Sequence, residues 1–274
     1  EASSIILTSE NVTLAKEKGK KVTININGKD INYTVIIPAK QLKKISDTTK
    51  PIDIMCKTIA AANLSEDSAK RQLATDLSQA LSAGGGKQEK TYVLSMAENP
   101  NLKAGMKIIA NVDKNTTIAA NQIVYVYKYN KNTGKFVEVA NSKQKVSANG
   151  QVLIDTKSGT DYVVSSKKLS GNKVKTIKSQ ISASVAKSKI KTGKSTKIKV
   201  SLPSVLKKVK NFSSSSTFGK EQAKITYKSS NKKIAVVTEE GKVKVKKAGK
   251  VTITTIITME SGQTKKIKNT ITVK

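Results

Sequence analysis

Apolar and polar residues alternate in short runs along most of the chain, the pattern of β-strands that bury one face. Residues 22–26 alternate three aliphatic side chains with two polar ones, and the Asn27-Gly28 dipeptide after them favours a tight turn. Pro38 ends the next run, since proline cannot donate to a strand ladder. The pattern therefore predicts strands at residues 5–8, 12–15, 22–26 and 31–37.

Residues 65–82 follow a helical period instead. Ser65 is a favourable N-cap, and the two acidic residues after it suit the positive end of a helix dipole. Apolar residues recur at helical spacing, at Ala69, Leu73, Leu77, Ala80 and Leu81. Glycines from Gly84 onward stop the pattern. We therefore predict one amphipathic helix, packed against a sheet.

Strand patterns then resume, at residues 92–96, 106–112, 123–129, 135–140, 151–155 and 161–165. Short strands separated by turn residues are typical of a β-sandwich. Residues 166–180 are polar and lysine-rich, so we place a domain boundary there. The first predicted domain, residues 1–170, is a β-rich, sandwich-like module that carries the helix at 65–82.

The second predicted domain, residues 175–274, is a further β-sandwich. Its strand patterns lie at 195–202, 223–228, 234–238, 242–246, 250–259 and 265–273. Lysines alternate with Val243 and Val245, which places the lysines outward and the valines in the core. Residues 203–222 interrupt the pattern with a Ser-rich insertion, and a loop of this length is usually functional or disordered. The predicted fold class is mainly β, with two tandem sandwich-like modules.

The charge of the chain is strongly positive, with 51 basic and 19 acidic residues and a formal net charge of +32. Arg71 is the only arginine. Arginine makes the bidentate contacts that read bases and phosphates, so a lysine surface indicates no specific nucleic-acid partner. Such a surface attracts polyanions in general. The alternative is that the lysines only keep the protein soluble.

Catalytic and metal chemistry have few candidate residues. The chain contains no histidine, which removes the commonest general base and a frequent metal ligand. Cys56, the only cysteine, lies in an apolar run and is expected to be a small buried side chain. We therefore expect no enzyme activity, no cofactor and no metal. No apolar run approaches the ~18 residues that cross a membrane, so we expect no membrane insertion.

Two motifs carry possible binding chemistry. Gly84-Gly85-Gly86-Lys87 resembles a phosphate-binding loop but ends a helix instead of opening one, so a helix stop is the better interpretation. Tyr125, Tyr127 and Tyr129 line one face of a predicted strand and could stack on sugar rings. The alternative is that these three rings fill the core.

The segment from Ile225 to Ile253 resembles the bacterial immunoglobulin-like domain, group 2, of the invasin and intimin type. The resemblance is carried by Ser229-Ser230-Asn231, Ile234-Ala235, Val237, Gly241-Lys242-Val243, Ala248-Gly249 and the strand from Val251. It covers roughly residues 180–274. It implies a β-sandwich that serves as a repeated stalk or adhesive module on bacterial surfaces, with no fixed ligand. The stretch from Val124 to Val139, with Asn149-Gly150-Gln151-Val152 and Asp161 to Val164, resembles sandwich modules of secreted clostridial-type proteins over about residues 90–168.

These observations predict a non-catalytic adhesion or spacer module of a secreted or cell-surface bacterial protein. The chain begins at Glu1, which we interpret as the result of signal-peptide removal or of trimming. Expected partners are anionic wall polymers, host glycans or surface proteins. The alternative function is a non-catalytic carbohydrate-binding or accessory tail of a secreted enzyme complex. The candidate binding residues are Tyr125, Tyr127, Tyr129, Lys207, Lys208, Lys210, Lys242, Lys244, Lys246 and Lys247.

Overall fold

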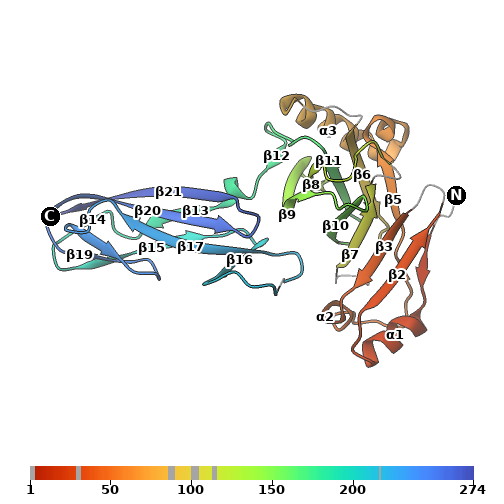
Figure 1. The fold of residues 1–274 in the computed structure, drawn as a ribbon, viewed down its shortest axis with the longest axis horizontal. Helices are drawn as coiled ribbons and strands as arrows, with labels where there is room; N and C mark the ends of the chain where they lie inside the picture. Colours follow the sequence, from red (N-terminus) through yellow and green to blue (C-terminus); the bar gives the residue numbers. More distant parts are fainter. Residues whose placement is uncertain (1–3, 29–31, 86–89, 100–104, 113–115, 216) are drawn as a thin grey trace. The chain divides into compact units, whose positions relative to one another are not determined.

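A computed structural model describes residues 4–28, 32–85, 90–99, 105–112, 116–215 and 217–274. The chain divides into two compact units, unit 1 at Glu1–Lys175 and unit 2 at Thr176–Lys274 (Figure 1). Both units are built mainly from antiparallel β-sheets.

Unit 1 contains two main sheets. The four-stranded sheet has the order β10 (Gln151–Thr156), β7 (Met106–Asn111), β3 (Asn32–Ile37) and β2 (Val22–Asn27). The six-stranded sheet has the order β12 (Val174–Lys175), β9 (Lys135–Lys145), β8 (Ile123–Asn130), β11 (Asp161–Ser165), β6 (Thr91–Met96) and β5 (Cys56–Ala60). A small pair joins β1 (Ile6–Leu7) to β4 (Ile52–Asp53).

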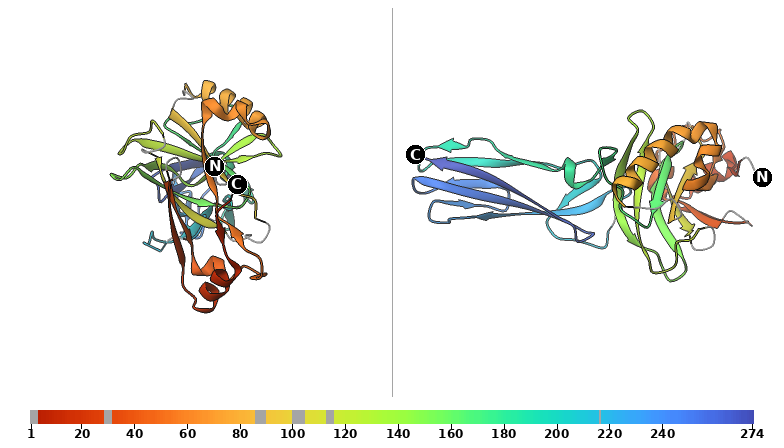
Figure 2. Two further views of the ribbon diagram at one scale, coloured as in Figure 1. Left: turned by 90° about the vertical axis from the view of Figure 1, so that its right-hand side faces the viewer. Right: turned by 90° about the horizontal axis from the view of Figure 1, so that it is seen from above.

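Two cores hold unit 1 together, one on each face of the six-stranded sheet. The larger core contains Val35 and Ile108 from the four-stranded sheet together with Leu94 and Val164 from the six-stranded sheet. The second core lies under helix α3 (Arg71–Ala83), which covers the other face of that sheet (Figures 1 and 2). Unit 1 is therefore a sandwich with an added helical layer.

The long helix begins later than the sequence predicted. Two 3-10 turns, η1 (Ala61–Glu66) and η2 (Ser68–Lys70), flank Asp67, and α3 follows them. Asp67 has an extended backbone, and its carboxylate accepts the Ala69 N–H at 2.9 Å. This local bond competes with a helix start at Ser65. The predicted stop is confirmed, because α3 ends at Ala83 and the Gly84 N–H bonds to Leu81. Gly86 and Lys87 lie outside the described residues.

The strand predicted at residues 12–15 is wrong, because these residues belong to helix α1 (Ser9–Glu17). The Thr8 side chain accepts the Asn11 N–H, Glu10 lies in the first turn and Lys16 in the last, as a helix dipole favours. Only Val12 of this nine-residue helix is fully buried, so the sequence shows too few apolar positions here to reveal a helical period. A further short helix, α2 (Ala39–Leu42), follows Pro38.

Unit 2 consists of two packed sheets (Figure 2). One has the order β13 (Ser182–Val185), β15 (Ser195–Ser201), β19 (Lys242–Val245) and β18 (Ala235–Val237). The other has the order β14 (Lys189–Ile190), β21 (Thr264–Val273), β20 (Gly249–Met259), β17 (Glu221–Ser229) and β16 (Leu206–Val209). A 3-10 turn, η4 (Lys178–Gln180), precedes them. This two-sheet arrangement is that of an immunoglobulin-like sandwich.

The turn residues of unit 2 take the roles expected from the sequence. The Asn231 side chain accepts the Lys233 N–H at 3.0 Å, which closes a turn after β17. Gly241 has a φ of +79°, and a Cβ there would lie 2.9 Å from the Tyr227 ring. Glycine is therefore required at position 241 for both its backbone and its packing.

The insertion at residues 203–222 is more ordered than predicted. Residues 206–209 form β16, which pairs in parallel with β17 and makes an edge of the five-stranded sheet. The buried Gln222 amide accepts the Ser213 N–H at 3.0 Å and donates to the Ser213 carbonyl. The insertion is thus tied to β17 at two places. Ser216 lies outside the described residues.

The segment at 166–175 is not the free polar linker that its composition suggested. Leu169 is buried in the core under α3, and β12 pairs in parallel with β9. The Tyr127 hydroxyl accepts the Leu169 N–H at 3.2 Å. The Phe136 N–H donates to the Lys173 carbonyl at 2.8 Å. Residues up to Lys175 therefore belong structurally to unit 1.

We predict that residues 1–175 and 176–274 fold as separate fragments, because each has its own core. Shortening the first fragment to 1–165 removes Leu169, Lys173 and β12. The shorter fragment should unfold at a lower temperature by at least about 2 °C, the smallest shift expected for a loss of about 1–2 kcal/mol in a domain of this size. Thermal unfolding followed by circular dichroism measures this, with fragment 1–175 as the control.

An equal melting temperature for the two lengths would show that the connecting segment does not stabilise unit 1. An unfolded 176–274 fragment would contradict the separate folding of the two units.

Candidate functional site

The tyrosine ladder predicted as a binding surface is a core element instead. Tyr127 and Tyr129 are 0 % and 6 % exposed, and Tyr125 is half-buried beside the same core. Helix α3 covers this face of the six-stranded sheet (Figure 1). The alternation of residues along one strand does not show whether another element covers the face that carries its tyrosine rings. The three residues therefore offer no open stacking platform to a sugar.

The hydroxyl groups of these tyrosines bind other parts of unit 1. The Tyr129 hydroxyl donates to Asp76 Oδ2 at 2.7 Å, and the Lys173 ammonium lies 2.7 Å from Asp76 Oδ1. Asp76 is 1 % exposed, and burial alone would raise its pKa. Hydrogen bonds from Lys173, Tyr129 and Gln72 outweigh burial and hold the pKa of the Asp76 carboxyl below its usual value. This cluster joins α3, β8 and the segment before β12.

We predict that Asp76→Ala lowers the free energy of unfolding of unit 1 by about 2–3 kcal/mol, because it leaves the Tyr129 hydroxyl and the Lys173 ammonium without their partner. Denaturant unfolding measures the loss. Glu17→Ala, which removes an exposed carboxylate on α1, is the matched control and should cost less than about 0.5 kcal/mol.

The effect should depend on pH. The pKa of Asp76 is lowered in the folded state, so its stabilisation is complete well above the ordinary carboxyl value of 3.8 and is lost as pH falls below it. The two proteins should therefore approach equal stability in acid. A difference that persists unchanged at low pH would contradict the ionic role of Asp76.

The lysines predicted to bind polyanions lie in three places in unit 2. Lys242 and Lys244 point outward from β19, with Val243 and Val245 buried between and beside them, as the alternation predicted. Lys207 and Lys208 lie on β16 at the edge of the other sheet, and Lys210 follows them. Lys246 and Lys247 are exposed in the connection from β19 to β20.

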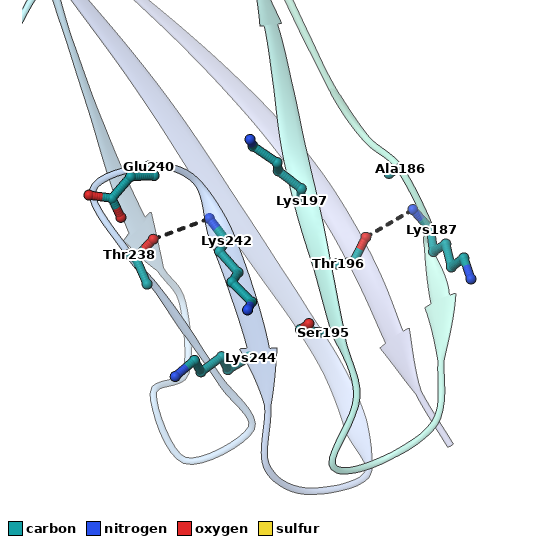
Figure 3. Close-up of a pocket in the computed structure, with 9 residues that line it drawn as sticks. All are labelled: Ala186, Lys187, Ser195, Thr196, Lys197, Thr238, Glu240, Lys242 and Lys244. Carbon is teal, nitrogen blue, oxygen red and sulfur yellow. Dashed lines mark hydrogen bonds between the residues drawn. The ribbon is translucent and has the colours of Figure 1, made fainter.

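A lysine-lined hollow of about 600 Å³ lies over the outer face of β15 and β19 (Figure 3). Four lysines surround it, of which Lys242 and Lys244 were candidates from the sequence and Lys187 and Lys197 were not. The small side chains of Ala186 and Ser195 also line it. The remaining lining residues are Thr196, Thr238 and Glu240. We call this set the lysine hollow.

Strand register explains why several lysines line the lysine hollow. Lys197 on β15 lies directly opposite Lys242 on β19, and Ser195 lies opposite Lys244. Side chains directly opposite each other on an antiparallel pair have Cβ atoms roughly 5 Å apart. In the part of the chain that the structure describes, Lys187, Lys197, Lys242 and Lys244 form no ion pair with a carboxylate.

Glu240 is the single carboxylate of the lysine hollow and lies in the turn between β18 and β19 (Figure 3). A hydrogen bond from the Thr238 hydroxyl lowers the pKa of Glu240, and the charges of Lys210 and Lys208 lower it further. Glu240 is therefore ionised at neutral pH. Lys208, on β16, and Lys210, just after it, thus affect the charge of Glu240.

The described residues hold no group of three or more Cys, Asp or Glu side chains that could bind a metal ion. Cys56 is buried, and burial raises the pKa of its thiol to about 12. A neutral, buried thiol is a poor nucleophile, so the expectation of a small buried side chain is confirmed. Among the helices described, none is long and apolar enough to cross a membrane.

Residues 180–269 match the family model of the bacterial Ig-like domain (group 2). Unit 2 is therefore a bacterial immunoglobulin-like domain, and the sequence-based prediction is confirmed for this part of the chain. No curated protein matches the chain.

Three solved structures overlap loosely with the chain. A glycosyl hydrolase family 2 member from Bacteroides cellulosilyticus is 13% identical over 66% of this chain and 24% of its own, with a TM-score of 0.22. Invasin, a bacterial integrin-binding protein, is 13% identical over 67% of this chain and 39% of its own, with a TM-score of 0.22. The M60 catalytic domain with the CBM51-1 and CBM51-2 domains from Clostridium perfringens ZmpB is 11% identical over 94% and 28%, with a TM-score of 0.12.

These TM-scores are too low to indicate a shared fold. The chain spans between 24% and 39% of the length of the three proteins. The resemblance of residues 90–168 to secreted clostridial-type modules stays a prediction.

Proposed function

We propose that this chain is a non-catalytic module of a secreted or cell-surface bacterial protein, in which unit 2 attaches to anionic polymers and unit 1 acts as a structural spacer. The observation that supports attachment best is the lysine hollow, which four lysines line and in which no carboxylate forms an ion pair with them among the described residues. Unpaired charge of one sign in a concave surface concentrates counter-ions of the opposite sign.

The distribution of charge over the chain supports the same division of roles. Residues 176–274 contain 24 lysines and four acidic residues. In unit 1 several lysines are neutralised locally, for example Lys70 by Asp161 and Lys107 by Asp155, both at 2.7 Å. The lysines of the hollow have no such partner in the described chain, so their charge remains available to a ligand.

The alternative was a non-catalytic carbohydrate-binding or accessory tail of a secreted enzyme complex, and its sugar-stacking form needed an open tyrosine face. Helix α3 covers that face, so the observation that favoured neutral sugar stacking is gone. A non-catalytic role is supported by the immunoglobulin-like assignment of unit 2 and by the absence of histidine from the sequence.

We predict that the full chain binds anionic polymers such as heparin with an affinity that falls steeply as salt rises. Exposed charges are screened beyond about 8 Å at physiological ionic strength, so binding through the lysines should weaken at least about tenfold between 50 and 300 mM salt. Surface plasmon resonance on an immobilised polymer measures this. A fragment of residues 1–175 is the comparison and should bind far more weakly.

Equal binding by the full chain and by 1–175 would place attachment outside unit 2. Binding that survives molar salt would contradict the electrostatic basis of the proposal. No binding even at low salt would leave the lysines with a solubilising role only.

A further inference from the structure

Among the register pairs of the described strands in unit 2, only the pair in the lysine hollow places two lysines opposite each other. On the described strands of the five-stranded sheet every paired lysine lies opposite a neutral residue, such as Lys266 opposite Ile256 and Lys268 opposite Thr254. Lys197 and Lys242 instead face each other. Like charges directly opposite on a sheet destabilise it. Unit 2 contains 24 lysines, and the described strands place two of them opposite each other only at this pair.

Two small side chains keep the space around this pair open. Ala186, whose N–H donates to the Lys197 carbonyl, lies beside Lys197 on the β13 side, and Ser195 lies opposite Lys244. Neither side chain is long enough to cover the lysine stems. The four ammonium groups point in different directions around the hollow (Figure 3), so a ligand would draw them together through rotation of the flexible lysine stems. The hollow has room for a small anionic group.

The position of Glu240 narrows the class of ligand. An ionised carboxylate accepts hydrogen bonds and donates none, so next to a bare chain of phosphates it would be repelled. A ligand that carries hydroxyl groups between its anionic groups satisfies both the lysines and Glu240. Ser195 and Thr238 add hydroxyls to the same lining.

The spacing of the lysines favours a short repeat. Lys242 and Lys244 are two residues apart on one strand, which places their Cβ atoms roughly 7 Å apart. A three-carbon polyol between two phosphates spans a comparable distance, whereas sulfated glycans carry their sulfates clustered on individual sugar rings. This inference rests on the proposed attachment to anionic polymers. We infer that the lysine hollow binds a polyol polymer whose units are linked by phosphodiesters. Its phosphate groups bind Lys197, Lys242 and Lys244, and a polyol hydroxyl donates to Glu240.

Two double variants of the full chain separate a shaped site from general charge. Lys197→Gln/Lys242→Gln removes the opposed pair, and Lys266→Gln/Lys268→Gln removes the same charge from the outer face of the other sheet. Binding to synthetic poly(glycerol phosphate) is measured by isothermal titration calorimetry at 0.15 M salt. The first variant should lose affinity about tenfold or more, as expected for lost charge-assisted hydrogen bonds. The control should lose less than about threefold.

Equal losses in the two variants would overturn the site and leave the proposed attachment by general charge intact. No binding by the unmodified chain would overturn both. The first variant should melt at the same or a higher temperature, because it relieves repulsion between like charges. Lys197→Arg/Lys242→Arg keeps the charge and should bind within about threefold of the unmodified chain, so a loss of binding in this variant would overturn the electrostatic role of the pair.

Glu240→Gln tests the recognition of hydroxyl groups. With inorganic polyphosphate, which has no polyol, the variant should bind more tightly than the unmodified chain because a repulsion is removed. With poly(glycerol phosphate) it should bind equally or more weakly, so that the ratio of the two affinities changes by about threefold or more. An equal gain for both polymers would overturn the assigned role of Glu240. Tighter, hollow-dependent binding of heparin than of poly(glycerol phosphate) would overturn the phosphodiester assignment.

Discussion

Each strand of unit 2 can bury only alternate side chains, and this constraint determines both its core and its surface. Val243, Val245, Val251 and Ile253 fill the space between the sheets, and the positions between them must face water. Lysine and threonine occupy most of those outward positions on β19, β20 and β21. With few aromatic residues available, the sandwich depends on complete burial of these aliphatic side chains. The pattern that forms the core therefore places the lysines of these strands on the surface.

Unit 1 differs from unit 2 because its six-stranded sheet is buried on both faces. One face packs on the four-stranded sheet and the other on α3. Burying the second face also buries polar groups, and unit 1 pairs them with one another. The Asp76 carboxylate meets Tyr129 and Lys173, and the Tyr127 hydroxyl meets the Leu169 N–H. These bonds satisfy buried groups whose desolvation would otherwise be costly, and they attach the connecting segment to unit 1.

The candidate site depends on register, which makes it sensitive to small changes in the fold. A shift of one residue between β15 and β19 would place Lys197 opposite Gly241 or Val243 and turn one set of lysines into the core. Gly241 fixes the turn before β19 through its left-handed backbone and its close approach to Tyr227. The geometry of the lysine hollow thus rests on the same turn that the family pattern marks in the sequence.

The sequence by itself determined the class of the fold, the immunoglobulin-like character of unit 2 and the outward direction of Lys242 and Lys244. These features depend on local alternation and on turn residues such as Asn231 and Gly241, which act within a few positions of the chain. The apolar run around Cys56 also indicated that this residue is buried. Local pattern was misleading where an element was short, as at residues 12–15, where a capped helix replaced the predicted strand.

Only the tertiary structure decided which residues meet across strands and layers. The tyrosines of β8 form a core because α3, about 50 residues away in the sequence, lies over them. The insertion at 203–222 gains a strand because β17 offers it an edge, and the segment at 166–175 is fixed by partners on α3, β8 and β9. The lysine hollow likewise unites Lys197 and Lys242, which are far apart in the chain and adjacent only through strand pairing. Alternation specifies which face a side chain takes, whereas its neighbour across the sheet depends on contacts that close long loops and leave no local signal.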